Sequence, residues 1–350
     1  MKWLFGLLIT AALAVGAFYG VGMFVVPSAV EVVRATDIDR PASIIYPLLS
    51  NLRTFNEISP WFDEDPKADY EFTGPREGEG QAASWVSSVQ SVGAGQQKIS
   101  HVTLNQRVEM DHTIGRVTAH SVFKLAPSKT SGTNVSWTMR LDCGPSLQNV
   151  PCRYLNLLEQ HTKAREIQAA LVKLKTLAEQ LPALEIASLT PQFVTVTSQD
   201  FAYVDPETTD DDVSIATAVA DAQKVVSAFL TKNALTPAGP LLSITQKQEN
   251  DKILLRVGIP YTGATPTTQI EVKTGKTPGG LALKVLNTGS REAMRPVYAR
   301  IDAYVAAHRL ERTGGSWEIY LDDPATTQPD QMRTAIYYPL KNADEAPSDQ

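Results

Sequence analysis

The N-terminal segment of the chain is an uninterrupted apolar run. From Trp3 to Val26 there are 24 residues without a charged side chain. As an α-helix rising about 1.5 Å per residue, this run is long enough to cross a bilayer hydrocarbon core of roughly 30 Å. Lys2 before it and Pro27 after it are also typical of a cleaved secretory signal, but the apolar core of such a signal has only about 7–15 residues. We therefore predict an uncleaved, single-pass transmembrane signal anchor at residues 1–27.

The flanking charges and the two cysteines bear on the compartment of the remaining chain. Charge orients the anchor weakly, because Lys2 and the terminal amine lie on one side, whereas Arg34 and Arg40 lie on the other. Cys143 and Cys152 lie in a segment rich in glycine and proline, where a disulfide would fit an oxidising compartment. Two unrelated buried thiols are the alternative. The anchor and the cysteine pair together favour the bacterial inner (cytoplasmic) membrane, with the soluble part in the periplasm.

Composition limits the number of domains and the class of partner. The chain has 350 residues, of which 43% are hydrophobic, so it is long enough for two soluble domains besides the anchor. Its 32 basic and 38 acidic residues give a net charge of -6, and no basic field is available to hold phosphates. Nucleic acid is therefore not a predicted partner. Within the anchor, Gly16 and Gly20 form a GxxxG pattern that would allow a homodimer to pack there.

The first soluble segment, residues 28–182, has the pattern of an antiparallel sheet followed by a long helix. Alternation predicts a strand at 29–38, an apolar face predicts a helical stretch at 42–55, and leucines near the helical period predict a helix at 154–181. Glycine and serine breaks separate short strands, which we expect at 81–90, 95–104, 106–114, 118–127 and 134–141. A curved sheet wrapped against a long helix leaves a space between them, which is the first candidate pocket.

After a linker at residues 183–190, the segment 191–341 contains an internal repeat. Two units with the order strand, helix, strand, strand follow one another, and their turn glycines Gly239 and Gly315 are 76 residues apart. We expect the elements of the first unit at 193–199, 213–235, 241–246 and 253–261, and those of the second at 281–289, 291–310, 317–323 and 332–340. Such a pseudo-symmetric domain offers a crevice between its halves for a small ligand. The tail at 342–350 is expected to be disordered.

Residues 30–182 resemble the START-like helix-grip superfamily (SRPBCC), which includes polyketide cyclase-like proteins. The motifs that carry the resemblance are SPWFDEDPKADYEFTGPREGEGQAASW, GAGQQKI, SGTNVSWTM and LVKLKTLAEQL. The resemblance implies a deep apolar cavity between sheet and helix, used in that superfamily for lipids, polyketides and other hydrophobic molecules. It does not imply catalysis, because many members have no demonstrated reaction.

Residues 191–341 look like the gyrase-inhibitor-like effector-binding domain of bacterial multidrug-responsive regulators. The resemblance rests on VGIPY, LNTGS, WEIYLDDP and IYYPL. It implies that the acidic residue of the E-x-Y strand, here Glu318, faces the central crevice with Tyr320 beside it and can meet cationic or polar ligands. The family often has an aromatic residue two positions after the turn glycine. This chain has Arg291 there, which puts the usual aromatic-walled drug site and the hydrolase activity of some relatives in doubt.

These resemblances define the fold class and the candidate ligand-binding residues. The fold is predicted to be α+β: a helix-grip antiparallel sheet with a long C-terminal helix, then a pseudo-symmetric tandem βαββ domain, preceded by one transmembrane helix. A carboxylate in mid-strand is costly to bury unpaired, so Glu318 is expected either to face ligand or to pair with Arg291 or Arg295. The candidate ligand-binding residues are Glu318, Tyr320, Tyr261, Tyr298, Trp85 and Trp137. For Tyr298 a place in the core is favoured, and Trp61, Trp85 and Trp137 are candidates for the first cavity or for its packing.

Other residues that suggest chemistry have simpler explanations. His101, His112 and His120 lie on neighbouring predicted strands, but their spacing matches no metal-ligand pattern, so neither metal nor cofactor is predicted. The acidic run at 210–212 precedes a helix and is expected to cap it. The markers of familiar nucleophile, phosphate and zinc chemistry are missing, which lowers the expectation of an enzyme.

Three functions remain as hypotheses. The first is a membrane-anchored protein that binds small hydrophobic or cationic molecules at the periplasmic face, as a sensor, carrier or scaffold. The second is a cyclase- or hydrolase-type enzyme with Glu318 as acid or base. The third is a non-catalytic docking subunit of an envelope protein complex, which large inward side chains filling both pockets would favour.

Overall fold

The chain forms two compact units, Met1–Glu185 (unit 1) and Ile186–Gln350 (unit 2), and each is described by itself. The computed structural model describes residues 2–59, 62, 64–90, 92–114, 117–264, 271–322 and 327–341. The boundary between the units falls inside the segment 183–190 that the sequence marks as a linker. The tail at 342–350, expected to be disordered, and Trp61 lie outside the described residues.

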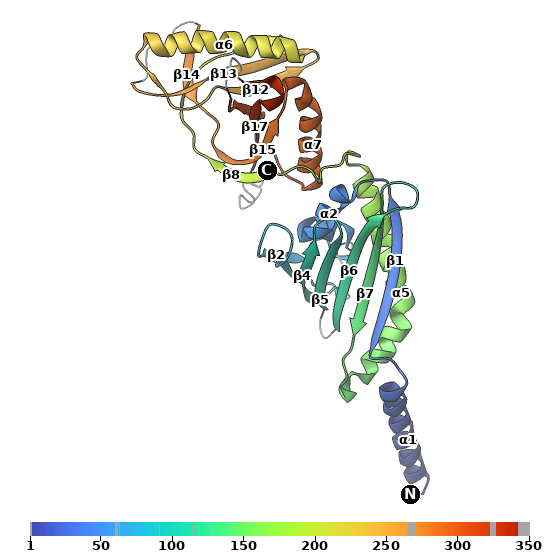
Figure 1. The fold of residues 1–350 in the computed structure, drawn as a ribbon. Coiled ribbons are helices and arrows are strands. Elements are labelled where there is room, and N and C mark those ends of the chain that lie inside the picture. The colour runs from blue at the N-terminus through green and yellow to red at the C-terminus, as the bar shows by residue number, and fades with distance from the viewer. Residues whose placement is uncertain are drawn as a thin grey trace. The chain divides into compact units, whose positions relative to one another are not determined.

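Unit 1 contains a seven-stranded antiparallel sheet in the order β1-β7-β6-β5-β4-β3-β2 (Figure 1). Its strands are β1 (Ala29–Ile38), β2 (Asp69–Thr73), β3 (Ala82–Val86), β4 (Ala94–Thr103), β5 (Arg107–Ile114), β6 (Val117–Pro127) and β7 (Thr133–Asp142). Strands β2 to β7 form a meander, and β1 pairs with the last of them. The expected strands are present, whereas β2 was not predicted because its short DYEFT pattern lies among turn-forming residues.

Three helices of unit 1 lie against this sheet. The stretch predicted at 42–55 is not one helix but two, α2 (Ala42–Ser50) and α3 (Leu52–Ile58). The break is at Asn51, which has an extended backbone and accepts a hydrogen bond from the Arg53 amide, as a helix N-cap does. The long helix α5 (Val150–Glu179) starts earlier than predicted, with Pro151 in its first turn, and packs along β1.

The interior of unit 1 is filled by large side chains. Phe55, Phe123 and Trp137 are at most 1% exposed and pack as an aromatic cluster, with 4.6 Å between the ring centroids of Phe123 and Trp137. The Trp137 Nε1–H donates to Ser121 Oγ at 3.0 Å, and His112 Nε2 lies 3.1 Å from the same oxygen. The indole therefore packs as a hydrogen-bonded core residue.

The N-terminal helix α1 (Lys2–Phe24) is joined to the start of α5 by polar contacts. From Trp3 to Phe24 it is long and apolar enough to cross a membrane, and none of its most apolar stretch is buried by other parts of the protein. The buried guanidinium of Arg153 donates to the carbonyls of Gly22 and Met23 at the end of α1 and to that of Gly144. A Cβ at Gly22 would overlap Val150, so glycine permits the close approach of the two helices. Arg153 thus supplies donors to the carbonyls left unpaired at the C-terminal end of α1.

A disulfide lies beside this junction. It joins Cys143, just after β7, to Cys152 in the first turn of α5, across the 3-10 turn η1 (Leu147–Asn149). The Asn149 side chain donates to the Cys143 carbonyl, and Asn156 donates to the Cys143 sulfur at 3.0 Å. Of the two alternatives that the sequence left open, the structure contains the bonded pair.

Unit 2 contains a ten-stranded antiparallel sheet in which two halves meet at β12 and β16. The path runs β14-β9-β13-β12-β16-β17-β15-β8, and the short strands β10 and β11 pair with β13. The strands are β8 (Gln192–Val196), β9 (Asp200–Val204), β10 (Glu207–Thr209), β11 (Thr236–Pro237), β12 (Leu242–Glu249), β13 (Lys252–Thr262), β14 (Lys273–Lys276), β15 (Gly280–Thr288), β16 (Trp317–Tyr320) and β17 (Arg333–Pro339). The halves are thus β9, β13, β12 and β16, β17, β15, each with one helix.

The predicted position of one strand of the repeat is wrong. The segment 193–199 was expected to open the first half, but β8 pairs with β15 at the edge of the second half. The first half instead opens with β9, which pairs with β13 in the position that β15 holds against β17. The error arose because FVTVTSQ alternates more clearly than DFAYV, although β9 is the more buried strand.

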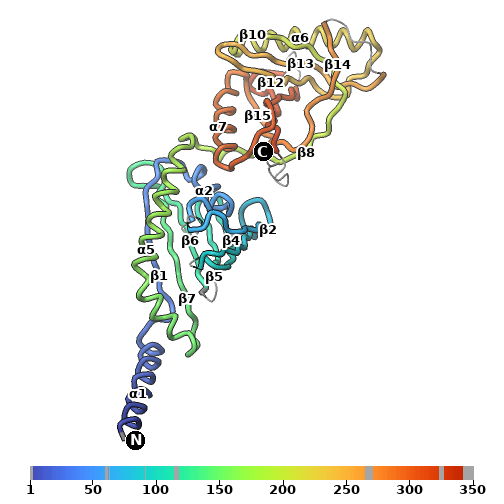
Figure 2. Tube along the Cα trace, turned by 180° about the vertical axis from the view of Figure 1, so that it is seen from behind, coloured from blue at the N-terminus to red at the C-terminus, as the bar shows by residue number. Residues whose placement is uncertain are grey.

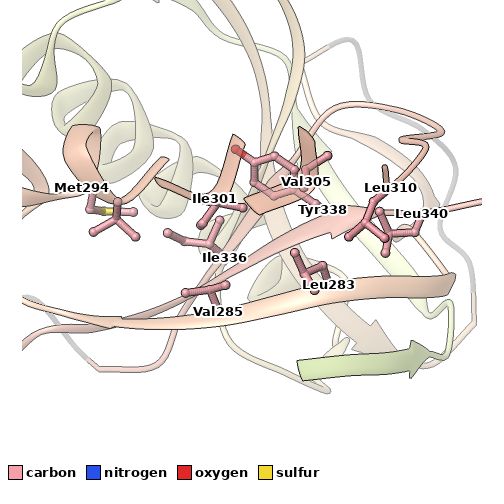
Figure 3. Packing of buried hydrophobic residues seen from close by; sticks show 10 residues of the cluster. Leu283, Val285, Met294, Ile301, Val305, Leu310, Ile336, Tyr338 and Leu340 are labelled. Atoms are coloured by element: carbon pink, nitrogen blue, oxygen red, sulfur yellow. The ribbon is translucent and has the colours of Figure 1, made fainter. Parts of the chain in front are cut away.

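Each half of unit 2 packs one helix on the sheet (Figures 1 and 2). Helix α6 (Asp212–Lys232) contacts β13 through Ile215, Val219 and Ala222. Its N-cap is Asp211, which accepts a hydrogen bond from the Ser214 amide at 2.8 Å, so the predicted capping by the acidic run is confirmed. Helix α7 (Met294–Ala307) packs on β15 and β17, and Figure 3 shows Ile301 and Val305 of this cluster near Ile336 and Tyr338.

The buried histidine of unit 1 predicts acid sensitivity. Burial lowers the pKa of His112 to about 4, below its value of 6.5 in an exposed chain. Between these two values the unfolded chain binds the proton and the folded chain does not. The contribution of neutral His112 to the unfolding free energy is therefore fully present above pH 6.5 and is lost as the pH falls towards 4. A loss of about 3 kcal/mol follows from a difference of this size. We expect His112→Gln to flatten this part of the stability profile of unit 1 in urea titrations.

The exposed His161 on α5 provides the matched control for this measurement. His161→Gln should leave the pH profile of wild-type stability as it is. A His112→Gln profile as steep as that of the wild type would show that the acid sensitivity has another source.

Candidate functional site

The candidate site is built around Glu318 in the central strand of unit 2. Glu318 stands on β16 between Ser243 of β12 and Ile336 of β17, and it is 6% exposed. Because side chains alternate along a strand, Glu318 and Tyr320 share one face, and Trp317 stacks on Tyr337 on the other. The face of Glu318 is the one on which α6 and α7 pack, so its carboxylate lies between the two halves.

Arg291 neutralises this buried carboxylate. It comes from the 3-10 turn η2 (Arg291–Ala293), which precedes α7, and its Nη1 lies 2.9 Å from Glu318 Oε2. Its Nη2 lies 3.5 Å from the other carboxylate oxygen. Of the two arginines that the sequence offered as partners, the structure places Arg291 on Glu318, whereas Arg295 lies near Asp210 and Asp212.

Two tyrosine hydroxyls complete the coordination of Glu318. Tyr298 of α7 donates to Oε1 at 2.6 Å, and Tyr320 donates to Oε2 at the same distance. Arg291 Nη1 also lies 3.4 Å from the Tyr320 hydroxyl. Each carboxylate oxygen therefore accepts a hydrogen bond from one tyrosine and from the guanidinium, which is the satisfaction that a buried charge requires.

The electrostatics keep Glu318 ionised. Burial alone would raise its pKa, but the charge of Arg291 and the hydrogen bonds from Arg291, Tyr298 and Tyr320 together hold that pKa below its usual value. Burial and the neighbouring carboxylate raise the pKa of both tyrosines well above the ordinary range. The cluster is thus a neutral unit at physiological pH: one carboxylate, one guanidinium and two phenols.

Two pockets adjoin this cluster. The larger, of about 720 Å³, is lined by α6, the turn before α7 and the ends of β16 and β17, and Tyr320 borders it. The smaller, of about 420 Å³, is lined by polar and charged residues that include Glu318 and Tyr298. Arg291 and Met294 border both. The apolar walls of the larger pocket are Ala216, Val219, Ala220, Pro240, Leu241, Leu321, Pro329 and Met332.

The structure brings together some of the predicted ligand-binding residues and separates others. Glu318, Tyr320 and Tyr298 meet in one cluster, and Tyr298 also packs on the α7 core. Tyr261 is 2% exposed and packs under α6 with Phe229 and Leu230, away from Glu318. Trp85 and Trp137 are buried in unit 1.

Sequence reasoning did not find the apolar wall that α6 supplies. Ala216, Val219 and Ala220 repeat at three- and four-residue spacing, but two of them are alanines, which a search for large apolar side chains overlooks.

The three histidines of unit 1 do not converge. His101 lies 3.3 Å from Glu79, His112 is buried against Ser121, and His120 lies between Glu109 and Asp111. Among the described residues no three His, Cys, Asp or Glu side chains are grouped so that they could hold a metal ion.

The family model of the GyrI-like small molecule binding domain matches residues 166–341. The chain belongs to this family. The match includes the whole Glu318 cluster and both pockets, together with the C-terminal part of α5. No curated protein matches this GyrI-like chain.

Solved structures similar to this GyrI-like chain include the EcmrR C-terminal domain, with a TM-score of 0.40 and 13% identity over 44% of this chain and 98% of that one. A hydrolase from Listeria innocua has a TM-score of 0.33 and 16% identity over 43% and 92%. Protein MLL2253 from Mesorhizobium loti has a TM-score of 0.31 and 15% identity over 43% and 98%. All three likenesses are distant.

The buried ion pair predicts strong energetic coupling in unit 2. Glu318→Gln removes the counter-charge of Arg291 in a place with little solvent, and we expect a loss of about 3 kcal/mol in unfolding free energy. Arg291→Gln should be similarly costly, and the double variant should lose less than the sum of the two. Chemical denaturation of the four proteins measures this coupling.

An exposed ion pair on β12 offers a matched control. Lys247 and Glu249 lie 2.9 Å apart, and their side chains are 62% and 65% exposed. Their double-mutant cycle should give under about 1 kcal/mol. Equal coupling in the two cycles would contradict a special role of burial at Glu318.

Proposed function

We propose that the chain is a small-molecule binding protein that acts as a sensor, carrier or scaffold, with the crevice of unit 2 as its ligand site. The observation that carries the proposal is the pocket of about 720 Å³ beside the Glu318 cluster. Ligand sites are usually apolar concavities of roughly 300–1,000 Å³ with a few polar groups that fix orientation. This pocket has apolar walls on α6 and in the segments next to β12, β16 and β17, and Arg291 and Tyr320 supply polar groups.

The geometry does not favour an enzyme that uses Glu318 as acid or base. Both carboxylate oxygens are engaged by Arg291, Tyr298 and Tyr320, and the pKa of Glu318 is held below its usual range. A general acid needs a raised pKa to carry a proton at neutral pH, and a general base is more effective with a pKa close to the working pH. The carboxylate instead serves to position the polar groups of the crevice.

For unit 1 we propose a START-like helix-grip fold whose interior is used for structure. The antiparallel sheet and the C-terminal helix α5 support the fold assignment. A lipid cavity at Trp137 is not favoured, because Phe55, Phe123 and Trp137 occupy that interior. This filling supports, for unit 1 alone, the third hypothesis, a docking module in an envelope protein complex.

We further propose that α1 anchors the chain in the inner membrane with both units in the periplasm. The length, apolar character and exposure of α1 support the anchor. Helix α6 is also long and apolar enough to span a membrane, but it packs on β13 in unit 2. The Cys143–Cys152 disulfide supports an oxidising compartment.

Filling the larger pocket should abolish ligand binding. Ala220 lies on the exposed side of α6 and lines this pocket, so Ala220→Trp should fill it without disturbing the core. We expect the small molecule that copurifies with the full chain, detected by native mass spectrometry, to be lost from this variant. Thr217→Trp, an exposed change on the same helix that does not line the pocket, should retain it.

Copurification that survives Ala220→Trp would place the ligand elsewhere. A wild-type chain that carries no small molecule and shows no thermal shift across a panel of apolar compounds would contradict the proposed function.

The membrane proposal is tested by fractionation and protease access. The full chain should remain in the membrane pellet after alkaline carbonate extraction, and a chain without residues 2–26 should be soluble. Protease added to spheroplasts should degrade units 1 and 2, whereas intact cells should protect them. Protection in spheroplasts would place the units on the cytoplasmic side.

A further inference from the structure

Arg291 forms the partition between the two pockets of unit 2. It projects from the turn η2 and borders both the 720 Å³ pocket and the 420 Å³ pocket. Its side chain is 22% exposed, and it crosses this position to reach Glu318 at 2.9 Å. A ligand in the larger pocket would therefore meet the guanidinium and the Tyr320 ring, with the carboxylate behind them.

The charges on the walls of the larger pocket are balanced. Glu318 is compensated by Arg291, and Asp322 is paired with Arg333 at 2.7 Å. Glu292 is the other carboxylate in the described lining of the larger pocket, and it is exposed to water. Among the described residues, this lining thus offers no buried, uncompensated negative charge to a cation.

The carboxylates of the smaller pocket also have arginine neighbours. Asp210 and Asp212 share Arg295, at 3.6 and 3.7 Å, and Asp302 lies 3.5 Å from Arg312. A cation entering from this side would compete with Arg295 or Arg312 for these carboxylates.

The guanidinium of Arg291 has more donors than its described neighbours have acceptors. Arg291 Nε is buried and has no hydrogen-bond partner within the described part of the chain, although both Nη atoms are engaged. Because Nε itself is shielded, an acceptor in the larger pocket would meet the exposed part of the guanidinium, which has five N–H donors and borders that pocket. A carbonyl oxygen provides such an acceptor without bringing a charge.

We propose that Arg291 sets the charge class of the ligand: the crevice accepts uncharged, largely apolar molecules that carry a carbonyl-type acceptor, and it rejects cations. This inference rests on the proposed small-molecule binding by unit 2. It assigns Arg291 as a specificity-determining residue whose removal exposes Glu318 and converts the same crevice into a site for cations.

Two probes of matched shape test the proposal. Acridone is an uncharged tricyclic ketone, and 9-aminoacridine has the same ring system with a positive charge at neutral pH. Each is titrated into the full chain in detergent micelles, and bound probe is counted by native mass spectrometry. Because every variant is measured in the same micelles, partition of the probe into detergent cancels in the comparison.

The wild type should bind acridone more tightly than 9-aminoacridine, by about tenfold, because the buried carboxylate of the crevice, Glu318, is already neutralised by Arg291. Arg291→Gln should reverse this preference by tightening 9-aminoacridine about tenfold or more and weakening acridone. Arg291→Gln combined with Glu318→Gln should lose the gain for the cation, because the exposed charge is removed as well. Where the single variant folds poorly, the double variant still tests the donor role of Arg291, because it should bind acridone more weakly than the wild type does.

Arg300→Gln is the matched control, since it makes the same change of net charge at a partly exposed residue of α7 that lies outside both pocket linings. It should keep the wild-type preference. Suppose that both probes bind the wild type, that Ala220→Trp blocks this binding, and that Arg291→Gln does not change the preference between the probes. This result overturns the role of Arg291 and leaves the proposed function intact. Failure of both probes to bind any of the proteins overturns the proposed function and this inference together.

Discussion

The buried ion pair between Arg291 and Glu318 is the constraint around which unit 2 is organised. A carboxylate at the centre of a ten-stranded sheet is tolerable only with full compensation, and each of its partners comes from a different place in the second half. The turn η2 supplies the guanidinium, α7 supplies the Tyr298 hydroxyl, and β16 itself supplies that of Tyr320. The start of α7 is therefore fixed by polar contacts as well as by its apolar face.

This arrangement also explains why the crevice stays open. In a sheet domain with one helix on each half, apolar side chains normally close the space between the helices. Here Arg291 and Glu318 occupy the middle of that space, and small residues of α6, Ala216 and Ala220, face its larger part. The domain thus keeps a concave apolar surface next to a fixed polar group, which is the usual composition of a ligand site.

Most of the fold could be predicted from the sequence, because long regular patterns determine it. The strands β4 to β7 and the helices α5, α6 and α7 follow from alternation and helical period, and their bounds differ from the predicted ones by a few residues. The short strand β2 escaped prediction because turn-forming residues flank its five residues, although DYEFT alternates. The opening strand β9 escaped because DFAYV has no clear alternation. The exchange of β8 for β9 shows that strand pairing depends on long-range contacts that a local pattern does not contain.

Part of the candidate site could also be predicted from the sequence. Glu318 stood out through the E-x-Y strand of the family resemblance and because a carboxylate in mid-strand is costly to bury unpaired, which also pointed to Arg291 or Arg295 as its partner. Which of two arginines would reach it depends on the direction in which η2 leaves the sheet, and the sequence holds no local record of that direction. The filling of unit 1 by Phe55 and Trp137 was equally hidden, because an aromatic residue on an inward strand face has the same pattern whether it lines a cavity or fills it.

The clamp of Arg153 on the last carbonyls of α1 has a mechanical meaning in the proposed membrane setting. Only four residues separate Phe24 from the first residue of β1, and the guanidinium ties the end of α1 to the first turn of α5. The link between α1 and the sheet of unit 1 would therefore not act as a flexible linker above the lipid. The sheet of unit 1 and α1 would move together, so that any tilt or rotation of α1 within the bilayer is transmitted directly to the sheet.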